Sequence, residues 1–521
     1  MAAALLWVAA AALLYLTARV VRFYRRVWRM HRLTADIPGP APYPLIGNVH
    51  RFLTPLDRMY QLMDSLCADF GYLFKFWIGP CLGVAVLDPE DLQVVLTSPA
   101  LASKPDEFYE CLMHVVGRGL ITLNGSDYKR HRKAITASMH YDILQEFVTM
   151  FGVNCRELEA RLDPLAETGE VFDVLHDLGR CASLSVCRTV LAAEAPGLEA
   201  ERDAFVQIVH DASKVMLYRG LRPWFRSRLL FKLSSWYERY YQVVEGGTNF
   251  ADKVLTQKTQ MLQQTAPTTP APAAHRRQTF LDTFLSSTEA SVLTRAELLD
   301  ELKTMLFAGI GTSMDFQSMF LLCMSLYPDM QRKVQQELDD VFGSDRDRDI
   351  VASDLPHMKY LECALKEALR FFPSVPVFAR VASQDVPLPS GRVIPEGCYV
   401  GVFPLWTHRH PKYFPDPERF DPERFTPENS RDRHPFAFIP FSTGLRSCIG
   451  QRFAMMFAKT VAASVLRRYD VLPDPDGPRR LVDVPLVGGI SLSVKGGVKV
   501  RLRRRGPHGL EHAEEPPVYG L

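Results

Sequence analysis

The apolar positions of the chain form one continuous run at the N-terminus and shorter periodic runs elsewhere. From Met1 to Val21 the residues are apolar apart from a tyrosine, a threonine and an arginine. A run of this length can cross the hydrocarbon core of a bilayer once, which takes about 20 residues. Six arginines lie between positions 19 and 32, with no acid before Asp36. Under the positive-inside rule, this pattern predicts a single-pass anchor over residues 1–22 whose C-terminal flank lies in the cytosol.

Two cleavable targeting segments are the alternatives to a retained anchor. A signal peptide carries its positive charges before the apolar run, whereas here they follow it. A mitochondrial presequence is rich in arginine, whereas the first 18 residues of this chain contain no Arg or Lys. The position of the charges therefore favours the anchor over both alternatives.

Prolines separate the anchor from the rest of the chain. The segment Ile37–Pro44 holds four prolines, which cannot continue a helix and make a stiff arm. We therefore predict a basic segment and proline-rich hinge over 23–44. A folded domain over 45–505 and a flexible tail over 506–521 are expected to follow. Inside the domain, the low-complexity stretch at 265–274 predicts an exposed loop.

A capping box marks the start of the longest predicted helix. Thr294 can accept from the first turn and Glu297 can reach back to it, and no proline follows until Pro328. This predicts one central helix of roughly 30 residues, about 45 Å long. Helical patterns also cover Asp329–Phe342 and Met358–Phe372. With only short β-like segments between helices, the predicted fold class is mostly α with minor β. Those segments are 85–87, 399–402 and 498–502.

The composition is that of a globular protein. Hydrophobic residues are 47% and charged residues 23% of the 521 residues, which excludes a disordered or multi-spanning chain. A formal net charge of +2 gives no basis for nucleic-acid binding. The ten cysteines are scattered without a CxxC pair, which argues against a disulfide scaffold or structural zinc. A reducing compartment is therefore expected.

The segment with the most chemical information runs from Phe441 to Gly450, directly before a helical pattern. Cys448 lies just ahead of a helix N-terminus, where the dipole and free N–H groups favour a thiolate. Gly444 permits a tight turn, and Gly450 lets a flat group approach the backbone. Arg446 offers a fork for a carboxylate. Together these groups suit haem, with Cys448 on the iron and Arg446 on a propionate.

The alternative for any single cysteine is a buried structural thiol, which holds in roughly four cases of five. The pattern FxxGxRxCxG fixes five positions, so a chance match in a chain of this length is on the order of one in several thousand. On this motif the chain resembles the cytochrome P450 superfamily, over nearly all of its length after the anchor. The similarity is greatest to family 4, the fatty-acid ω-hydroxylase group. The runs that support family 4 are 131–136, 143–147, 410–417 and 438–441.

The resemblance also implies a structural triad beneath the haem. Glu367 and Arg370 match the family's ExxR motif, although such a pair is more often a solvated contact on a helix surface. In the family a downstream arginine joins them, and the FDPERF segment assigns Arg424 to that position. Arg419, in a near-duplicate of this segment, is the competing candidate.

Two further cations are implied to bind the haem propionates. The segment 124–132 resembles the family's WxxxR helix, with Tyr128 where Trp is usual and Arg132 in its expected place. We expect the Tyr128 hydroxyl to donate to a propionate. Arg380 matches another propionate position. An ordinary surface charge is the alternative for either arginine. The residues implied to contact haem are Tyr128, Arg132, Arg380, Phe441, Gly444, Arg446, Cys448 and Gly450.

The long helix departs from the superfamily pattern (A/G)Gx(D/E)T(T/S). Thr312, the implied catalytic residue that orders water in the family, is present, but Gly311 replaces the acid that relays a proton. Gly309 and Gly311 each weaken a helix by about 1 kcal/mol, so we expect a local widening that admits water. Asp315, three residues after Thr312, is a conceivable substitute relay. Ala308 replaces the glutamate that many family-4 members link to haem by an ester. Non-covalent haem b and looser selectivity for the terminal carbon are therefore expected.

The resemblance implies a haem-thiolate monooxygenase in the endoplasmic reticulum membrane, with its catalytic domain facing the cytosol. Its electrons would come from NADPH through NADPH-cytochrome P450 reductase, with cytochrome b5 as a further donor. Its substrates would be O2 and a hydrophobic molecule that is fatty acid-like, terpenoid or xenobiotic. Arg130, Lys133, Arg452 and Lys459 could form a basic docking face for an acidic partner, or an ordinary solvated face.

Two other functions stay open. One is an isomerase or dehydratase that converts a hydroperoxide without a reductase, which the missing acid at Gly311 suggests and the presence of Thr312 opposes. The other is a non-enzymatic haem-binding protein, for which the weakened relay is the sole motivation.

Overall fold

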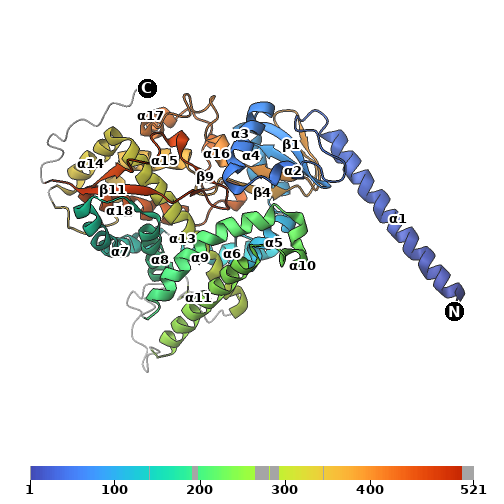
Figure 1. The fold of residues 1–521 in the computed structure, drawn as a ribbon, viewed down its shortest axis with the longest axis horizontal. Helices are drawn as coiled ribbons and strands as arrows, with labels where there is room; N and C mark the ends of the chain where they lie inside the picture. The colour runs from blue at the N-terminus through green and yellow to red at the C-terminus, as the bar shows by residue number, and fades with distance from the viewer. Residues whose placement is uncertain are drawn as a thin grey trace.

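The computed structural model describes residues 2–139, 141–190, 197–264, 281, 293–343 and 345–506. The expected loop at 265–274 and all of the expected tail except residue 506 lie outside the described residues. Figure 1 shows a broad body of helices and sheets from which the N-terminal helix α1 projects. The helices of the body are α2 (Val49–Phe52), α3 (Met59–Phe70), α4 (Pro89–Thr97), α5 (Asp106–Val116), α6 (Gly125–Ser138), α7 (Tyr141–Thr168), α8 (Leu175–Val190), α9 (Glu199–Gly220), α10 (Arg228–Phe231), α11 (Tyr237–Gln264), α13 (Arg295–Leu326), α14 (Pro328–Phe342), α15 (Lys359–Phe371), α16 (Pro404–Thr407), α17 (Pro427–Ser430) and α18 (Gln451–Arg468).

Helix α1 (Ala2–Leu33) continues past the predicted anchor and includes the whole basic segment. Arginine is a good helix former, and the first proline is Pro38, so nothing in this segment ends the helix earlier. The basic segment is therefore helical, and the chain leaves the helix at Thr34, just before the proline-rich stretch. The stretch Leu5–Leu33 is long and apolar enough to cross a membrane, and none of its most apolar window is buried against the protein. At its C-terminal end Met30 is buried and belongs to the same apolar cluster as Trp77.

Helix α13 occupies the centre of the body and confirms the predicted long helix. The Thr294 side chain accepts from the Glu297 backbone, and the Glu297 carboxylate accepts from the Thr294 backbone at 2.8 Å. The helix ends at Leu326, two residues before the proline that opens α14. It packs against α8, α9 and α11 and also against α15 and α18. Like α1, it is long and apolar enough to span a membrane, but 83% of its most apolar window is buried, so it is a core helix.

Small sheets lie around these helices, and the predicted class of mostly α with minor β is confirmed. A four-stranded sheet has the order β1-β2-β7-β4, in which β2 and β7 are parallel. A second sheet has the order β3-β11-β8, and two-stranded sheets pair β5 with β6 and β9 with β10. The three predicted extended segments fall in β2, β7 and β11. The strands are β1 (Leu73–Ile78), β2 (Cys81–Val86), β3 (Phe172–Asp173), β4 (Phe378–Val381), β5 (Val386–Pro387), β6 (Val393–Ile394), β7 (Tyr399–Val402), β8 (Tyr469–Pro473), β9 (Leu486–Val487), β10 (Ser493–Val494) and β11 (Lys499–Arg504).

Candidate active site

The cysteine loop is held in a fixed shape immediately before α18. The Cys448 backbone N–H donates to the Phe441 carbonyl at 2.9 Å, which closes the loop between them. Gly444 has φ +70°, and a Cβ there would lie 2.1 Å from the Leu96 carbonyl oxygen. Both the backbone conformation and the contact therefore require glycine. By contrast, a Cβ on Gly450 would have only the Cys448 Sγ within 4 Å, at 3.9 Å, so a ligand has room beside this backbone.

The Cys448 thiol faces the interior of the protein. Its side chain keeps accessible surface, yet burial raises the pKa of the thiol. Accessible surface and burial occur together when a thiol lies below the molecular surface and faces an accessible internal space. The Gly450 N–H and the Arg132 charge act in the opposite direction and lower this pKa. The helix N-terminus alone therefore does not secure the thiolate, which a coordinated metal ion would stabilise.

Four cations converge near this loop. Arg132 of α6 donates to the Ser447 carbonyl at 2.7 Å, and Arg446 donates to the Leu123 carbonyl at 2.7 Å. Arg380 of β4 donates to the neighbouring Ala379 carbonyl at 3.0 Å. Lys104, between α4 and α5, donates to the Ile121 carbonyl. The four cations come from separate parts of the chain: Lys104, Arg132, Arg380 and Arg446.

These cations have backbone partners but no carboxylate partner among the described residues, since none forms a salt bridge there. Burial, with the nearby Arg380 adding to its effect, lowers the pKa of Arg446 to about 10. Burial also lowers the pKa of Lys104 far below its usual value, with Arg446 and Arg380 adding to the shift. Arg380 is buried and the other three cations are partly buried. Cations withdrawn from water without an anion are costly, so their arrangement favours a ligand with carboxylate groups. The two propionates of haem fit this requirement.

Tyr128 supports the site differently from the prediction. Its hydroxyl donates to the Leu445 carbonyl at 3.0 Å and not toward the cations. Its ring lies under the Arg446 guanidinium, 3.6 Å from the ring centroid. This contact orients Arg446, a role that a tryptophan ring could also fill. Sequence reasoning missed Lys104 because this lysine belongs to no motif, and only the fold brings it to the arginines.

One face of α13 carries the accessible residues of an otherwise buried stretch. Met305, Ala308, Gly309 and Thr312 are partly accessible, and their spacing puts them on one side of the helix. The Thr312 hydroxyl donates to the Ala308 carbonyl at 2.7 Å. The side chain at 308 carries no carboxyl group, so an ester bond to a ligand cannot form there.

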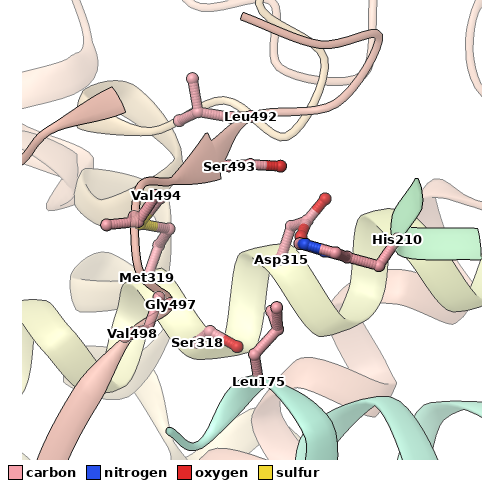
Figure 2. A pocket seen from close by; sticks show the side chains of 10 residues that line it. All are labelled: Leu175, His210, Asp315, Ser318, Met319, Leu492, Ser493, Val494, Gly497 and Val498. Carbon is pink, nitrogen blue, oxygen red and sulfur yellow. The ribbon is translucent and has the colours of Figure 1, made fainter. Parts of the chain in front are cut away.

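The expected widening of α13 at its glycines does not occur. The α-helix runs unbroken from Arg295 to Leu326. Val186 of α8 packs against Gly309, and Val209 of α9 packs against Gly311, each with a methyl group 3.0 Å from where a Cβ would be. Packing on both sides thus offsets the low helix propensity of glycine. Asp315 lies on the buried side and lines a recess shown in Figure 2.

The ExxR pair is fully buried and not the solvated contact that is its commoner form. Arg370 donates to both Glu367 oxygens, at 2.7 and 2.8 Å, and neither side chain is exposed. The Arg424 Nε lies 3.7 Å from the Glu367 Oε1. The competing Arg419 points outward with 68% of its side chain exposed, although its carbonyl accepts from Arg370. The geometry therefore selects Arg424 as the third member.

The expected basic docking face is only partly present. Lys459 is 9% exposed and pairs with Glu362 at 2.5 Å, so it cannot contribute to a surface. Arg130 pairs with Glu297 of α13. Lys133 and Arg452 remain exposed. The expectation is thus wrong for Lys459, because α18 turns that residue toward the core.

Comparisons with known proteins extend the similarity beyond these motifs. The family model described as Cytochrome P450 matches residues 37–498. Cytochrome P450 4V2 of Rattus norvegicus is 34% identical, with 99% of this chain and 97% of the rat protein aligned. The Homo sapiens protein of the same name is 32% identical, with 97% and 96% aligned. Cytochrome P450 4c3 of Drosophila melanogaster is 30% identical, with 93% and 92% aligned. The similarity is therefore not confined to the cysteine loop.

Proposed function

The chain belongs to the cytochrome P450 family, and on this premise we propose that it hydroxylates fatty acid-like substrates at a membrane with electrons from NADPH. The family makes it a haem-thiolate monooxygenase, and therefore an oxidoreductase. The substrate, the electron donor and the location are the parts of this function that we propose.

Members of the family bind haem b non-covalently through a cysteine thiolate. In this chain Cys448 would be that ligand, beside Phe441 and the two glycines of the loop. Arg132, Arg380 and Arg446 would hold the propionates, with Lys104 as a fourth cation. The observation that carries this assignment is the group of four wholly or partly buried cations that lack a carboxylate partner among the described residues. When bound, haem supplies the activation of O2 and the oxidation of the C–H bond.

The chain's own residues position the reactants and manage the protons. The backbone of the cysteine loop places the thiol, and the ring of Tyr128 orients Arg446. The accessible face of α13 offers Thr312 as the hydroxyl that orders water. The triad of Glu367, Arg370 and Arg424 stabilises the segment between α16 and α17, since Asp421 of that segment donates its backbone N–H to Glu367 at 2.8 Å. These last three residues are structural and not catalytic.

We infer the location from α1. An exposed apolar helix with a basic C-terminal flank suits a single-pass anchor in the endoplasmic reticulum membrane, with residues 45–505 as one catalytic domain in the cytosol. A proline-containing arm from Thr34 to Pro44 links the two. Electrons would arrive from NADPH-cytochrome P450 reductase, with cytochrome b5 as a second donor. Lys133 and Arg452 stay available for an acidic partner.

Similarity to family 4 supports a fatty acid-like substrate over a terpenoid or xenobiotic one. Without a carboxyl group at position 308, the haem has no covalent tether on α13, so oxidation at carbons near the chain end is expected beside ω-oxidation. The alternative reaction is reductase-independent conversion of a hydroperoxide. Its motivation is Gly311, because such a reaction needs no proton delivery.

The test is product analysis with the full-length protein in vesicles, together with NADPH and its reductase. A panel of fatty acids and terpenoids is incubated with wild-type protein, Cys448→Ala and the matched control Cys67→Ala. We expect reductase-dependent hydroxylation of fatty acids by wild type and the control. Cys448→Ala should lose both haem absorbance and product, because the proposed iron ligand is gone.

Two results would overturn the proposal. Product formed equally by Cys448→Ala would remove the cysteine from the reaction. Conversion of a fatty-acid hydroperoxide without NADPH, and no NADPH-dependent product, would establish the isomerase or dehydratase reaction instead.

A further inference from the structure

Asp315 of α13 holds a carboxyl group inside the protein with half of its hydrogen-bonding capacity unused. The residue is 3% exposed, and its Oδ2 has no hydrogen-bond partner. Ser491, in the loop between β9 and β10, lies near the same carboxyl group and lowers its pKa. A buried polar atom without a partner costs free energy and is rare in native proteins, so its presence calls for a reason.

The carboxyl group lines a recess that is partly open to solvent. Its walls come from α8, α9, α13 and β10 and include His210, Ser318, Met319 and Ser493. Figure 2 shows the Asp315 carboxyl group and the His210 ring reaching into the same space. Four of its ten lining residues have polar side chains within an otherwise apolar lining, and the space is about large enough for one water molecule.

His210, which lines this recess, is paired with Lys214 one turn further along α9. Lys214 Nζ lies 2.9 Å from His210 Nε2, and the Lys214 charge acts on Asp315. Burial lowers the pKa of both His210 and Lys214, so both hold their protons less tightly than usual. The titratable and charged groups around Asp315 and this pair are His210, Asp211 and Lys214 of α9, Tyr60 of α3, Asp173 of β3 and Arg239 of α11.

The position of Asp315 on α13 relates it to the missing acid. Asp315 follows Gly311 by one helical turn, so both occupy the same face of the helix. Both also face α9, where Gly311 meets Val209 and Asp315 shares the recess with His210. Thr312 is three residues before Asp315, and side chains at this spacing are neighbours, with Cβ atoms about 5–6 Å apart. A single water can bridge such a pair.

We propose that Asp315 is the proton-relay residue of this enzyme, displaced by one helical turn from the position that Gly311 occupies, and that the recess resupplies it from solvent. The proposal rests on the proposed function, because a relay is needed only where O2 is reduced. Asp315 releases a proton to a water beside Thr312 and regains one through the recess, where His210 and Lys214 lie. No electrons move in this step, and one solvent proton enters for each proton delivered.

The electrostatics of the carboxyl group agree with this role. Burial raises the pKa of Asp315 to about 7, with Ser491 and Lys214 opposing the rise. A carboxyl group with this pKa exists in both protonation states near neutral pH, which a donor that must be recharged requires.

The test compares Asp315→Asn with wild-type protein and with Asp91→Asn, a buried acid of α4 whose pKa is also raised by burial. Asparagine keeps the size of the side chain and its contact with Ser491 but cannot release a proton. The first readout needs no turnover: infrared difference spectra of the carboxyl C=O stretch between pH 5 and pH 9. We expect a band that titrates near pH 7 in wild type and Asp91→Asn and is absent in Asp315→Asn.

The second readout is the coupling of NADPH consumption to product. In Asp315→Asn we expect product formation to fall about 10–100-fold, hydrogen peroxide release to rise, and the inflection near pH 7 to vanish from the rate profile. The solvent deuterium isotope effect on product formation should change as well. A double variant, Gly311→Asp with Asp315→Asn, made in a Val209→Ala background to open space, should regain part of the coupling.

Several outcomes would overturn the relay. Unchanged coupling, pH profile and isotope effect in Asp315→Asn would exclude it, as would the same infrared band in wild type and variant. If wild-type protein itself makes no NADPH-dependent product, the proposed function fails and the relay fails with it. If wild type and Asp315→Asn are equally active, the relay is excluded but the proposed function stands.

Discussion

Glu367 and Asp315 are both carboxylates that the fold removes from water, but their surroundings are opposite. Glu367 accepts two hydrogen bonds from Arg370 and one from the Asp421 backbone, so its charge is neutralised and its oxygens are used. Asp315 has one oxygen without a partner and a lysine charge nearby. A buried acid whose bonds are all made can hold structure together. A buried acid with an unused hydrogen-bonding oxygen can still exchange a proton. Glu367 therefore suits a structural role and Asp315 suits proton transfer.

The strongest way to break this comparison is to remove the charge of Glu367. In Glu367→Gln, Arg370 would stay buried without its counter-ion, which should lower the free energy of unfolding by about 3–5 kcal/mol. Urea unfolding followed by circular dichroism measures the loss. Glu428→Gln is the matched control, since Glu428 of α17 is exposed and forms no ion pair among the described residues. A loss below about 1 kcal/mol would mean that the pair does not stabilise this region.

The second test uses the pH dependence of stability. Because the pKa of Asp315 is raised to about 7 in the folded protein, the folded state holds this proton more tightly than the unfolded state does. Wild-type stability should therefore fall as pH rises from about 4 to about 7 and then level off. Each unit of pKa shift corresponds to about 1.4 kcal/mol.

Asp315→Asn should lack this fall, so the difference between variant and wild type should grow with pH up to about 4 kcal/mol. Thermal unfolding at pH 5, 6, 7 and 8 measures it. Parallel stability curves for the two proteins over this range would show that Asp315 is already ionised at pH 5. Its charge would then be stabilised in the folded protein, and the contrast with Glu367 would not hold.

The smallest expected effect distinguishes the two arginines near Glu367. Arg424→Gln should lower the free energy of unfolding by about 1–2 kcal/mol, because its guanidinium is largely buried and close to Glu367. Arg419→Gln should change it by less than about 0.5 kcal/mol, because its side chain is mostly exposed. Urea unfolding under one set of conditions compares the variants. The reverse order would make Arg419 the third member of the triad.

Predictions from local patterns were confirmed where local forces decide the result. The capping box set the start of α13 and the proline set its end. The motif around Cys448 correctly placed a tight turn at Gly444. The prediction of a widened α13 failed because propensity concerns the isolated helix, whereas Val186 and Val209 pack against the two glycines.

Other differences came from the direction in which side chains point. The charge of Lys459 suggested a surface residue, yet α18 turns it inward to Glu362. The hydroxyl of Tyr128 was expected to face a ligand, but it bonds to the Leu445 carbonyl. Lys104 joined the cations without any sequence signal, because only the packing of its loop brings it near Arg446.

By itself the sequence determined the family, the cysteine loop, the long helix and the apolar N-terminal helix, because each depends on neighbours in the chain and on fixed spacings. The tertiary structure settled the charges for which the motifs left a choice or gave no signal. It selected Arg424 over Arg419 as the partner of Glu367, left four cations without a carboxylate in the described part of the chain, and placed Asp315 near His210 and Lys214 of α9. Pairing depends on distances between segments far apart in sequence, and the energy of a buried charge depends on what those segments bring to it.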